Sequence, residues 1–383
     1  MSKTEWKEYE MSELIEEISM GPFGSNIKVE CFTDSGVPVL NGSNLVGFRL
    51  NEDSFNYVTE EKATSLGKAN AYRGDIVITH RGTLGQIVYI PQNSKYSRYV
   101  ISQSQFRVRC NEKVIPEYLV YYFHSRLGQH KLLSNASQVG VPSLARPTST
   151  FQKLTIEIPS IERQKEIVKI LSALDDKIEL NNAINRNLEE QAQAIFKSWF
   201  VDFEPFDGEM PEDWKLYKLS NFLPVVTGKK NANISVLNGT YPFFSCSQDV
   251  LWTDCYSFDG NAILVAGNGD FNVKFYNGKF EAYQRTYVLI PFEKRYAAWL
   301  YYAVKYNLDD ITKGARGSVI KFITKGDLEN FEFAAPQKLD SFKLLNIFDS
   351  INKIIESMKY ENSQLSTLRD TLLAKLMSGE FGV

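Results

Sequence analysis

The stretch IERQKEIVKILSALDDKIELNNAINRNLEEQAQAIFKSWF, residues 161–200, decides the fold that this sequence predicts. It contains neither proline nor glycine, and its apolar side chains recur at alternating steps of three and four residues. This spacing is typical of a helix that packs on another helix along a coiled-coil seam. We therefore expect one long helix over 161–200 and a second long helix as its partner.

The partner helix is expected in the same chain. A shift of 177 positions takes Pro159 to Pro336 and brings a second helical pattern into register with the first. The expected seam residues are Leu171, Leu174, Ile178, Asn185, Leu188 and Ile195 in the first copy and Phe348, Ile351, Ile355, Asn362, Leu365 and Leu372 in the second. Asparagine in such a seam costs stability but fixes the register of the helices.

The segments before the two helices also resemble one another. The run WKEYEMSEL at 6–14 matches WKLYKLSNF at 214–222, and GDIVITHRG at 74–82 parallels GNAILVAGNG at 260–269. Each long helix is entered from a strand-like run that ends in proline, a residue suited to a helix start. The chain is therefore expected to be a tandem duplication.

The predicted fold class is α+β. Two globular mixed α/β domains are separated by two long antiparallel coiled-coil helices, as a pseudo-twofold tandem repeat. The predicted segments are a first domain over 1–155, a first helix over 156–205, a second domain over 206–333 and a second helix over 334–383. Within the first domain we expect short strands and two helical segments, Glu10 to Ile18 and Pro116 to Leu133.

Composition narrows the function. The four cysteines have no metal-binding spacing, which indicates neither a zinc site nor a disulfide framework. The start of the chain lacks a signal-peptide pattern and no run of eighteen apolar residues occurs, so a cytoplasmic protein is expected. The net charge of −3 argues against a protein that coats nucleic acid through bulk positive charge.

The charges are unevenly distributed. No acidic residue lies between Asp75 and Glu112, where the basic residues are Arg81, Lys95, Arg98, Arg107 and Arg109. In the second half, the stretch between Asp310 and Asp327 is likewise basic. Acidic residues concentrate in the two helices. Ordinary solvated surface also produces such runs, but basic globular parts on acidic helices are the pattern expected of a DNA-reading module on a spacer.

Polar side chains suited to DNA gather on loops and strand tips. The loop GPFGSNIK (21–28) has glycines that permit a close approach, although a capped turn explains it equally well. Arg, Asn and Gln can contact base edges, whereas Lys mostly holds phosphate. The candidate DNA-binding residues are Lys28, Asn41, Asn44, Arg81, Arg98, Gln103, Gln105 and Arg146 in the first half, and Lys229, Lys230, Asn231, Asn268, Arg285, Lys313, Arg316 and Lys321 in the second.

No catalytic motif accompanies these residues. The sequence lacks a phosphate-binding G-x-x-x-x-G-K-[ST], a dinucleotide-binding G-x-G-x-x-G, an H-E-x-x-H and a G-x-S-x-G. We expect a non-catalytic binding protein with no metal or cofactor of its own. A single-chain DNA-modifying enzyme, with a fused methyltransferase or nuclease, and a coiled-coil scaffold protein are the alternatives.

Several of these runs together resemble one family. The helix entrance IPSIERQKEIVKILSALDDKIELNN, the exit FKSWFVDFEPF, the GPFGSNIK loop and the GDIVITHRGTLG hairpin are similar to the specificity subunit of type I restriction-modification systems, over essentially the full chain. The second helix entrance and the second hairpin, AGNGD, depart from the family pattern.

The resemblance implies a role in a larger complex. It implies two target recognition domains, each binding one half of a bipartite double-stranded DNA target, with the helices setting the spacer length. It also implies two methylation subunits, which carry S-adenosylmethionine and methylate adenine, and two restriction subunits, which use ATP and magnesium to cleave DNA.

Overall fold

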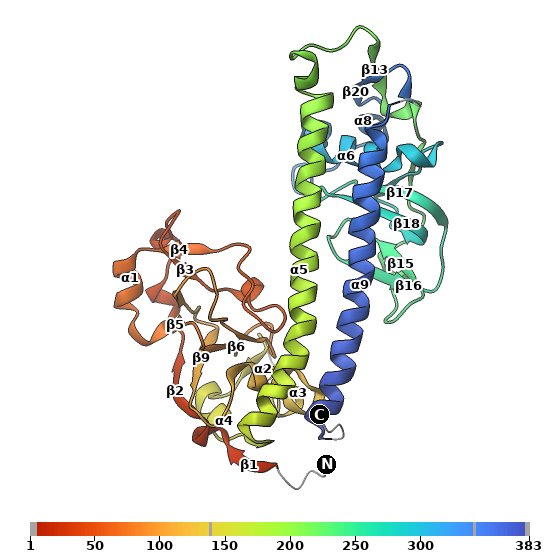
Figure 1. Cartoon of the computed structure of the whole chain (residues 1–383). Helices are drawn as coiled ribbons and strands as arrows, with labels where there is room; N and C mark the ends of the chain where they lie inside the picture. The colour runs from red at the N-terminus through yellow and green to blue at the C-terminus, as the bar shows by residue number, and fades with distance from the viewer. Residues whose placement is uncertain (1–5, 138–139, 340–341, 380–383) are drawn as a thin grey trace. The chain divides into compact units, whose positions relative to one another are not determined.

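The computed structural model of the chain describes residues 6–137, 140–339 and 342–379 (Figure 1). It contains two compact units, Met1–Ile178 with Ser363–Val383, and Glu179–Asn362. We call them unit 1 and unit 2. Two long helices, α5 (Ile161–Phe200) and α9 (Leu345–Met377), contribute residues to both units. No helix among the described residues has the length and apolar character needed to cross a membrane.

The first helix has the bounds that its sequence pattern predicts, whereas the second starts later than expected. The boundary at 334 falls inside strand β20 (Glu332–Pro336), and α9 begins only at Leu345. Likewise, the boundary at 156 falls inside strand β12 (Thr155–Ile158). Pro159 therefore follows a strand, and Pro336 ends one that belongs to a two-stranded sheet, where proline is tolerated because each strand is an edge strand.

Each unit ties its two ends together with one pair of antiparallel strands. In unit 1, β1 (Lys7–Glu10) pairs with β12, with Tyr9 opposite Ile156. In unit 2, β13 (Trp214–Lys218) pairs with β20, with Tyr217 opposite Phe333. The first strand of each pair is related to its copy by the same shift of 208 positions that relates residues 6–14 to 214–222. The second strand is related to its copy by the shift of 177 positions that takes Pro159 to Pro336. The tandem repeat predicted from sequence is thus present at the level of strand register.

A four-stranded antiparallel arrangement lies at the centre of unit 1. In spatial order its strands are β2 (Ile15–Met20), β9 (Gln105–Cys110), β6 (Ile76–Thr79) and β7 (Ile87–Tyr89). The predicted helical segment over 116–133 is present as α2 (Pro116–His124) and α3 (Arg126–Leu132). Buried tyrosines and phenylalanines of α2 belong to the same hydrophobic core as this sheet and the buried Leu171 of α5.

Unit 1 carries a second four-stranded sheet, in which every strand is three residues long. Its strands in spatial order are β4 (Asn56–Val58), β3 (Val37–Val39), β8 (Arg98–Val100) and β5 (Asn70–Tyr72). The short helix α1 (Glu60–Ser65) packs beside it through the buried Ala63.

Unit 2 repeats the four-stranded arrangement within a six-stranded sheet. In spatial order the strands are β14 (Val225–Thr227), β19 (Thr286–Leu289), β17 (Phe258–Ala266), β18 (Val273–Ala282), β15 (Tyr241–Phe244) and β16 (Val250–Thr253). The first four correspond in order and chain position to β2, β9, β6 and β7. Helix α6 (Ala297–Tyr306), whose buried residues include Trp299, occupies the place of α2.

The helix expected over Glu10 to Ile18 is wrong. The segment forms a 3-10 turn at Met11–Glu13 and then strand β2, which pairs with β9 through a bulge between Ile15 and Glu17. Its apolar residues have helical spacing, but pairing with β9 places the Glu17 carboxylate 2.7 Å from the Arg107 guanidinium. Tertiary contacts thus override the local pattern.

The long helices pair in antiparallel fashion within each unit. In unit 1 the buried Asp175 carboxylate of α5 accepts a 2.8 Å hydrogen bond from Arg369 of α9. In unit 2 the buried Asn181 side chain donates to the Asn362 side chain over 2.9 Å, and the rings of Phe196 and Phe348 lie 6.4 Å apart.

The predicted seam is buried to different degrees. Leu171, Phe348, Ile351 and Ile355 are buried, whereas Leu174, Ile178, Asn185, Leu188, Ile195, Asn362, Leu365 and Leu372 are half-buried. The sequence pattern missed Phe196 and Phe200, which are buried in the core of unit 2. A helix that packs on both a partner helix and a globular domain has a wider apolar face than a coiled-coil seam.

Candidate nucleic-acid interface

In unit 1, the loop after β2 packs tightly on a turn of the same domain. The Gly21 amide donates to the Gln105 carbonyl over 2.8 Å, and a Cβ atom at Gly21 would lie 1.9 Å from the Ser102 carbonyl oxygen. A Cβ atom at Gly24 would lie 2.1 Å from the Gln103 side-chain oxygen. The close approach that these glycines permit is therefore to the turn 102–105, and it fixes the loop beside Gln103.

The tip of the β6–β7 hairpin lies on the other side of that turn. The His80 amide donates to the Ser104 carbonyl over 2.8 Å, and its imidazole Nε2 lies 3.1 Å from the Gln103 carbonyl. Burial lowers the pKa of His80, which favours the neutral imidazole. Arg81, the next residue, is exposed. The hairpin expected from sequence thus presents an arginine beside the exposed Gln103.

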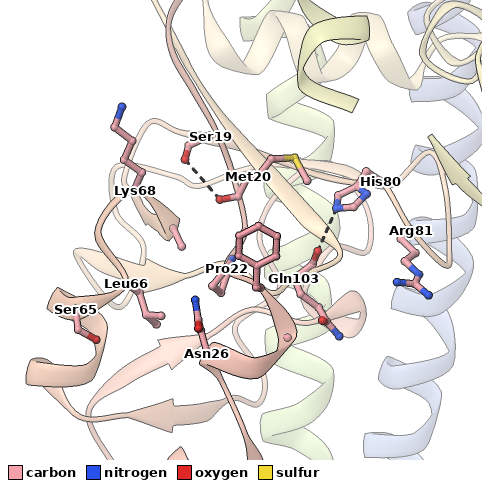
Figure 2. A pocket seen from close by; sticks show the side chains of 14 residues that line it. Ser19, Met20, Pro22, Asn26, Ser65, Leu66, Lys68, His80, Arg81 and Gln103 are labelled. Carbon is pink, nitrogen blue, oxygen red and sulfur yellow. Dashed lines mark hydrogen bonds between the residues drawn. The ribbon is translucent and has the colours of Figure 1, made fainter. Parts of the chain in front are cut away.

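A hollow of about 570 Å³ separates these features (Figure 2). Its lining includes Phe23, Lys68, Arg81 and Gln103, and Figure 2 shows Lys68 and Arg81 on opposite sides of it. Phe23 is 84% exposed at its edge. Sequence reasoning selected this loop for its polar residues and missed Phe23 and Lys68. The position of Phe23 between Gly21 and Gly24 was a signal that the sequence offered for this residue.

A two-stranded ribbon is hydrogen-bonded to the hairpin tip. It is formed by β10 (Ala136–Ser137) and β11 (Ser143–Leu144). The Leu144 amide donates to the His80 carbonyl over 2.9 Å, and the Gly82 amide donates to the Pro142 carbonyl over 2.9 Å. The described residues of this segment form regular pairs, while Gln138 and Val139 lie outside the described residues.

Unit 2 builds the same loop and hairpin. The Gly228 amide donates to the Thr286 carbonyl over 2.9 Å, and a Cβ atom at Gly228 would lie 2.2 Å from the Tyr283 carbonyl oxygen. The Gly267 amide at the β17–β18 tip donates to the Arg285 carbonyl over 2.9 Å. These contacts correspond one by one to those of Gly21 and His80 in unit 1.

The ribbon is repeated as well. In unit 2 Arg316 and Phe322 form an isolated antiparallel bridge, with backbone hydrogen bonds of 2.9 and 2.8 Å. The Ile323 amide donates to the Gly267 carbonyl over 3.0 Å, and the Gly269 amide donates to the Lys321 carbonyl over 2.9 Å. Loop, hairpin tip and ribbon therefore recur on one backbone plan.

The side chains on this plan differ between the units. Hydrogen-bond register places Asn268 where unit 1 has Arg81, and Arg285 where unit 1 has Ser104. Counting from the packed glycines, Lys230 stands in place of Phe23. One scaffold thus carries two different sets of hydrogen-bond donors and apolar groups.

Several predicted residues of unit 1 have structural roles instead. Asn44 is buried and its amide donates to the carbonyls of Asn51 and Ser54, while Gln105 is buried and its side-chain oxygen accepts from the Ser102 amide over 2.9 Å. Neither side chain is accessible in this structure, so the geometry gives no support to these two predicted DNA contacts. Side-chain patterns on a strand cannot show which polar residue faces inward.

Two further residues are engaged within the domain. Asn41 caps the short turn after it by accepting from the Ser43 amide over 2.8 Å. The Arg98 guanidinium is paired with the Glu60 carboxylate. Both are half-buried, so their contact with DNA would compete with these bonds.

The basic stretch of unit 1 is partly neutralised. Arg107 is buried and lies 3.3 Å from the Asp75 carboxylate, which also contacts Arg109 over 2.9 Å. The hydrogen bond from Arg107 lowers the pKa of Glu17. The count of basic residues along the sequence therefore overstates the positive charge available at the surface.

The other predicted residues lie at or near the surface. Lys28, Arg81, Gln103, Arg146, Lys229, Asn231, Arg285, Lys313, Arg316 and Lys321 are exposed, and Lys230 and Asn268 are half-buried. The loop, tip and ribbon of unit 1 bring together Arg81 and Gln103, and those of unit 2 bring together Asn268, Arg316 and Lys321. Lys313 follows helix α7 (Leu308–Thr312), and Arg146 precedes helix α4 (Pro147–Gln152).

This duplicated scaffold matches one protein family twice. The model for the type I restriction modification DNA specificity domain matches residues 3–190 and 211–367. The chain belongs to this family, as a specificity subunit with two such domains in tandem.

Individual relatives agree with the family match. The chain is 37% identical to the EcoDI specificity subunit of Escherichia coli, over 45% of this chain and 40% of that subunit. It is 27% identical to the MjaIX specificity subunit of Methanocaldococcus jannaschii, over 85% of this chain and 82% of that protein. The crystal structure of the S subunit of a type I restriction-modification system from M. genitalium has the same fold, with a TM-score of 0.58, 17% identity and coverage of 97% of this chain and 96% of that one.

Proposed function

We propose that this chain selects the DNA target of a type I restriction-modification complex. Each unit binds one half of a bipartite double-stranded site through its loop, hairpin tip and ribbon. Arg81 and Gln103 contact base edges in one half, and Asn268 and Arg285 do so in the other, while Lys28, Arg146 and Lys321 contact phosphates.

One observation carries this proposal. The same hydrogen-bond pattern holds loop, tip and ribbon in both units, and except for Gln103, which corresponds to the exposed Gln284, the side chains named above on this pattern differ between the units. Two domains that recognise different DNA sequences require one constant backbone scaffold that carries different polar side chains. A scaffold protein would need neither the repeated tips nor their variation.

The remaining parts of the complex are supplied by partners. We assign adenine methylation to two methylation subunits that carry S-adenosylmethionine, and ATP- and magnesium-dependent cleavage to two restriction subunits. The long helices dock the methylation subunits and set the spacer between half-sites, because α5 alone rises roughly 60 Å at ~1.5 Å per residue. Such a complex would work in the cytoplasm, where cellular and incoming DNA are found.

Catalysis by partners can be tested directly. The purified chain is incubated with radiolabelled S-adenosylmethionine and mixed-sequence DNA, with and without co-expressed methylation subunits. We expect transfer of label only when those subunits are present. Transfer by the chain alone would contradict the proposal and support a single-chain modifying enzyme.

A further inference from the structure

The ribbons of the two units can be aligned residue by residue. In unit 1, Ser137 pairs with Ser143 across a five-residue connection, and in unit 2 Arg316 pairs with Phe322 across a connection of the same length. Both ribbons make the same two backbone hydrogen bonds to their hairpin tip. Val141 of unit 1 therefore occupies the same position as Ile320 of unit 2.

This position carries an exposed aliphatic side chain in both units. Val141 is 54% exposed and Ile320 is 58% exposed. Single exposed aliphatic residues are ordinary on protein surfaces. Here, however, the following residue changes from Pro142 to Lys321, and the hairpin tip changes from arginine to asparagine. A β-branched aliphatic group that persists where its neighbours vary indicates a contact that both units share.

The surroundings of the two side chains indicate the chemistry of that contact. The residue after Val141 accepts a hydrogen bond from Gly82, which adjoins Arg81 at the tip. The residue after Ile320 accepts one from Gly269, which adjoins Asn268. Arginine and asparagine read base edges in the major groove, which also admits a two-stranded ribbon. The apolar group exposed on base edges in that groove is the C5-methyl of thymine.

We infer that Val141 and Ile320 are specificity-determining residues that each contact a thymine methyl group, one in each half of the target. This inference rests on the proposed function, since it requires that both units face DNA. The ribbon thus adds an apolar contact to the polar contacts of the hairpin tip. Wedging between base pairs, which is mostly a minor-groove device, is the competing use of such side chains.

The test uses the full chain assembled with its methylation subunits. The target is first selected from randomised duplexes, and each thymine in it is then replaced singly by deoxyuridine, which lacks only the methyl group. Binding is measured by fluorescence anisotropy. We expect one sensitive thymine in each half-site, with affinity reduced about fourfold for the loss of one buried methyl contact.

Substitutions link each sensitive thymine to its residue. Val141→Ala should abolish the difference between thymine and deoxyuridine in the first half-site only, and Ile320→Ala in the second only. Val141→Ile should retain the difference. The matched controls are Val29→Ala in unit 1 and Leu237→Ala in unit 2, whose side chains are 82% and 94% exposed but lie outside the ribbons; both should leave the difference unchanged.

The outcomes separate this inference from the proposed function. Failure to select any bipartite target would overturn the proposed function itself. A normal bipartite target with no sensitive thymine, or with sensitivity that persists in both alanine variants, would overturn only the inference. Alanine variants that weaken thymine and deoxyuridine DNA equally, with a change in 2-aminopurine fluorescence at one base step, would establish wedging instead.

Discussion

Substitutions at Arg81 and Lys28 test the proposed division between contacts to bases and contacts to phosphates. Both side chains are exposed in unit 1, Arg81 at the hairpin tip and Lys28 after the glycine loop. Arg81→Ala should remove about 1–3 kcal/mol of discrimination at one base pair of the first half-site. Lys28→Ala should weaken binding to all sequences alike. It should also reduce the slope of the logarithm of the binding constant against the logarithm of the salt concentration by about one.

Binding titrations at several salt concentrations, with single-base variants of the target, measure both effects. Arg98→Ala is the control, because its guanidinium is paired with Glu60. It should change base preference less than Arg81→Ala does. Loss of preference in the second half-site after Arg81→Ala would show that the two units do not read independently.

Gly21 is required by the backbone packing of the loop on the turn 102–105. Alanine there would place Cβ 1.9 Å from the Ser102 carbonyl oxygen, so the loop or the turn must shift. Gly21→Ala should lower the stability of unit 1 by about 1–3 kcal/mol, as overpacking does. In Gly42→Ala the nearest atom is 3.7 Å away, and we expect little change. Chemical denaturation followed by circular dichroism compares the two.

Histidine burial makes unit 1 sensitive to acid. Burial lowers the pKa of both His80 and His124, and His124 Nε2 lies 2.8 Å from the Ile87 carbonyl. The unfolded chain binds protons at these residues below about pH 6.5, while the folded unit resists protonation, so stability falls as pH decreases from that value.

Thermal melts at pH 7.5 and 5.5 should show this loss. His124→Gln should reduce the difference between the two melting temperatures, because it removes one buried titrating group. His130→Gln, at an exposed position, should leave the difference as it is in the wild type. An equal reduction by both variants would contradict the role given to burial.

At the scale of elements, the sequence predicts what depends on local periodicity. The helix 161–200 and the hairpin carrying Arg81 have the expected form, and the helical segment expected over 116–133 is present but divided at Ser125. Strand β2 does not, because the spacing of Ile15 and Ile18 fits a helix, and both side chains pack on one core in the strand only with the bulge between Ile15 and Glu17. Only the pairing with β9, distant in sequence, decides between them.

The location of the candidate site was predictable from the sequence, but the roles of its individual side chains were not. The loop, tip and turn were identifiable from glycines flanked by polar residues, and the structure brings them together around one hollow. The burial of Asn44 and Gln105, and the pairing of Arg107 with Asp75, depend on tertiary contacts that no single sequence displays. The equivalence of the two ribbons became visible only from their hydrogen bonds.

The asparagines of the helix pair offer a test at this scale. Sequence spacing relates Asn185 to Asn362, but the side chain that Asn362 contacts in unit 2 is Asn181, over 2.9 Å. Asn181 also donates to Glu361 over 2.7 Å, and Asn362 donates to Asn182 over 2.8 Å. These polar groups should trade stability for register.

Asn181→Leu or Asn362→Leu alone should lower the melting temperature, because the remaining asparagine loses its bond to the replaced side chain and packs against leucine, a loss of up to about 1–3 kcal/mol. The double substitution should restore it to the wild-type value or above, because both polar partners are then removed. A double variant less stable than either single variant would show that the two side chains are not partners in the seam.

At the scale of the whole molecule, the helices are proposed to set the spacer between half-sites. Inserting seven residues after Ala183 and seven after Tyr360 keeps the helical contacts in phase and lengthens the pair by roughly 10 Å. The preferred spacer should then grow by about three base pairs if the helices lie along the DNA, at ~3.4 Å per base pair.

Selection from duplexes with randomised spacer lengths measures this change. The half-site sequences should stay the same. Insertion into one helix only is the control, and it should weaken the subunit because seven residues lose their partners. An unchanged spacer length in the variant with both insertions would show that the helices do not set the spacer between half-sites.

The central claim is that one chain reads two different half-sites with two copies of one scaffold. Selection from a fully randomised duplex pool, with the wild-type chain assembled with its methylation subunits, tests it most directly. We predict two short, different defined sequences separated by a spacer of fixed length and no preferred sequence. A single continuous site, or two identical half-sites in a palindrome, would contradict it.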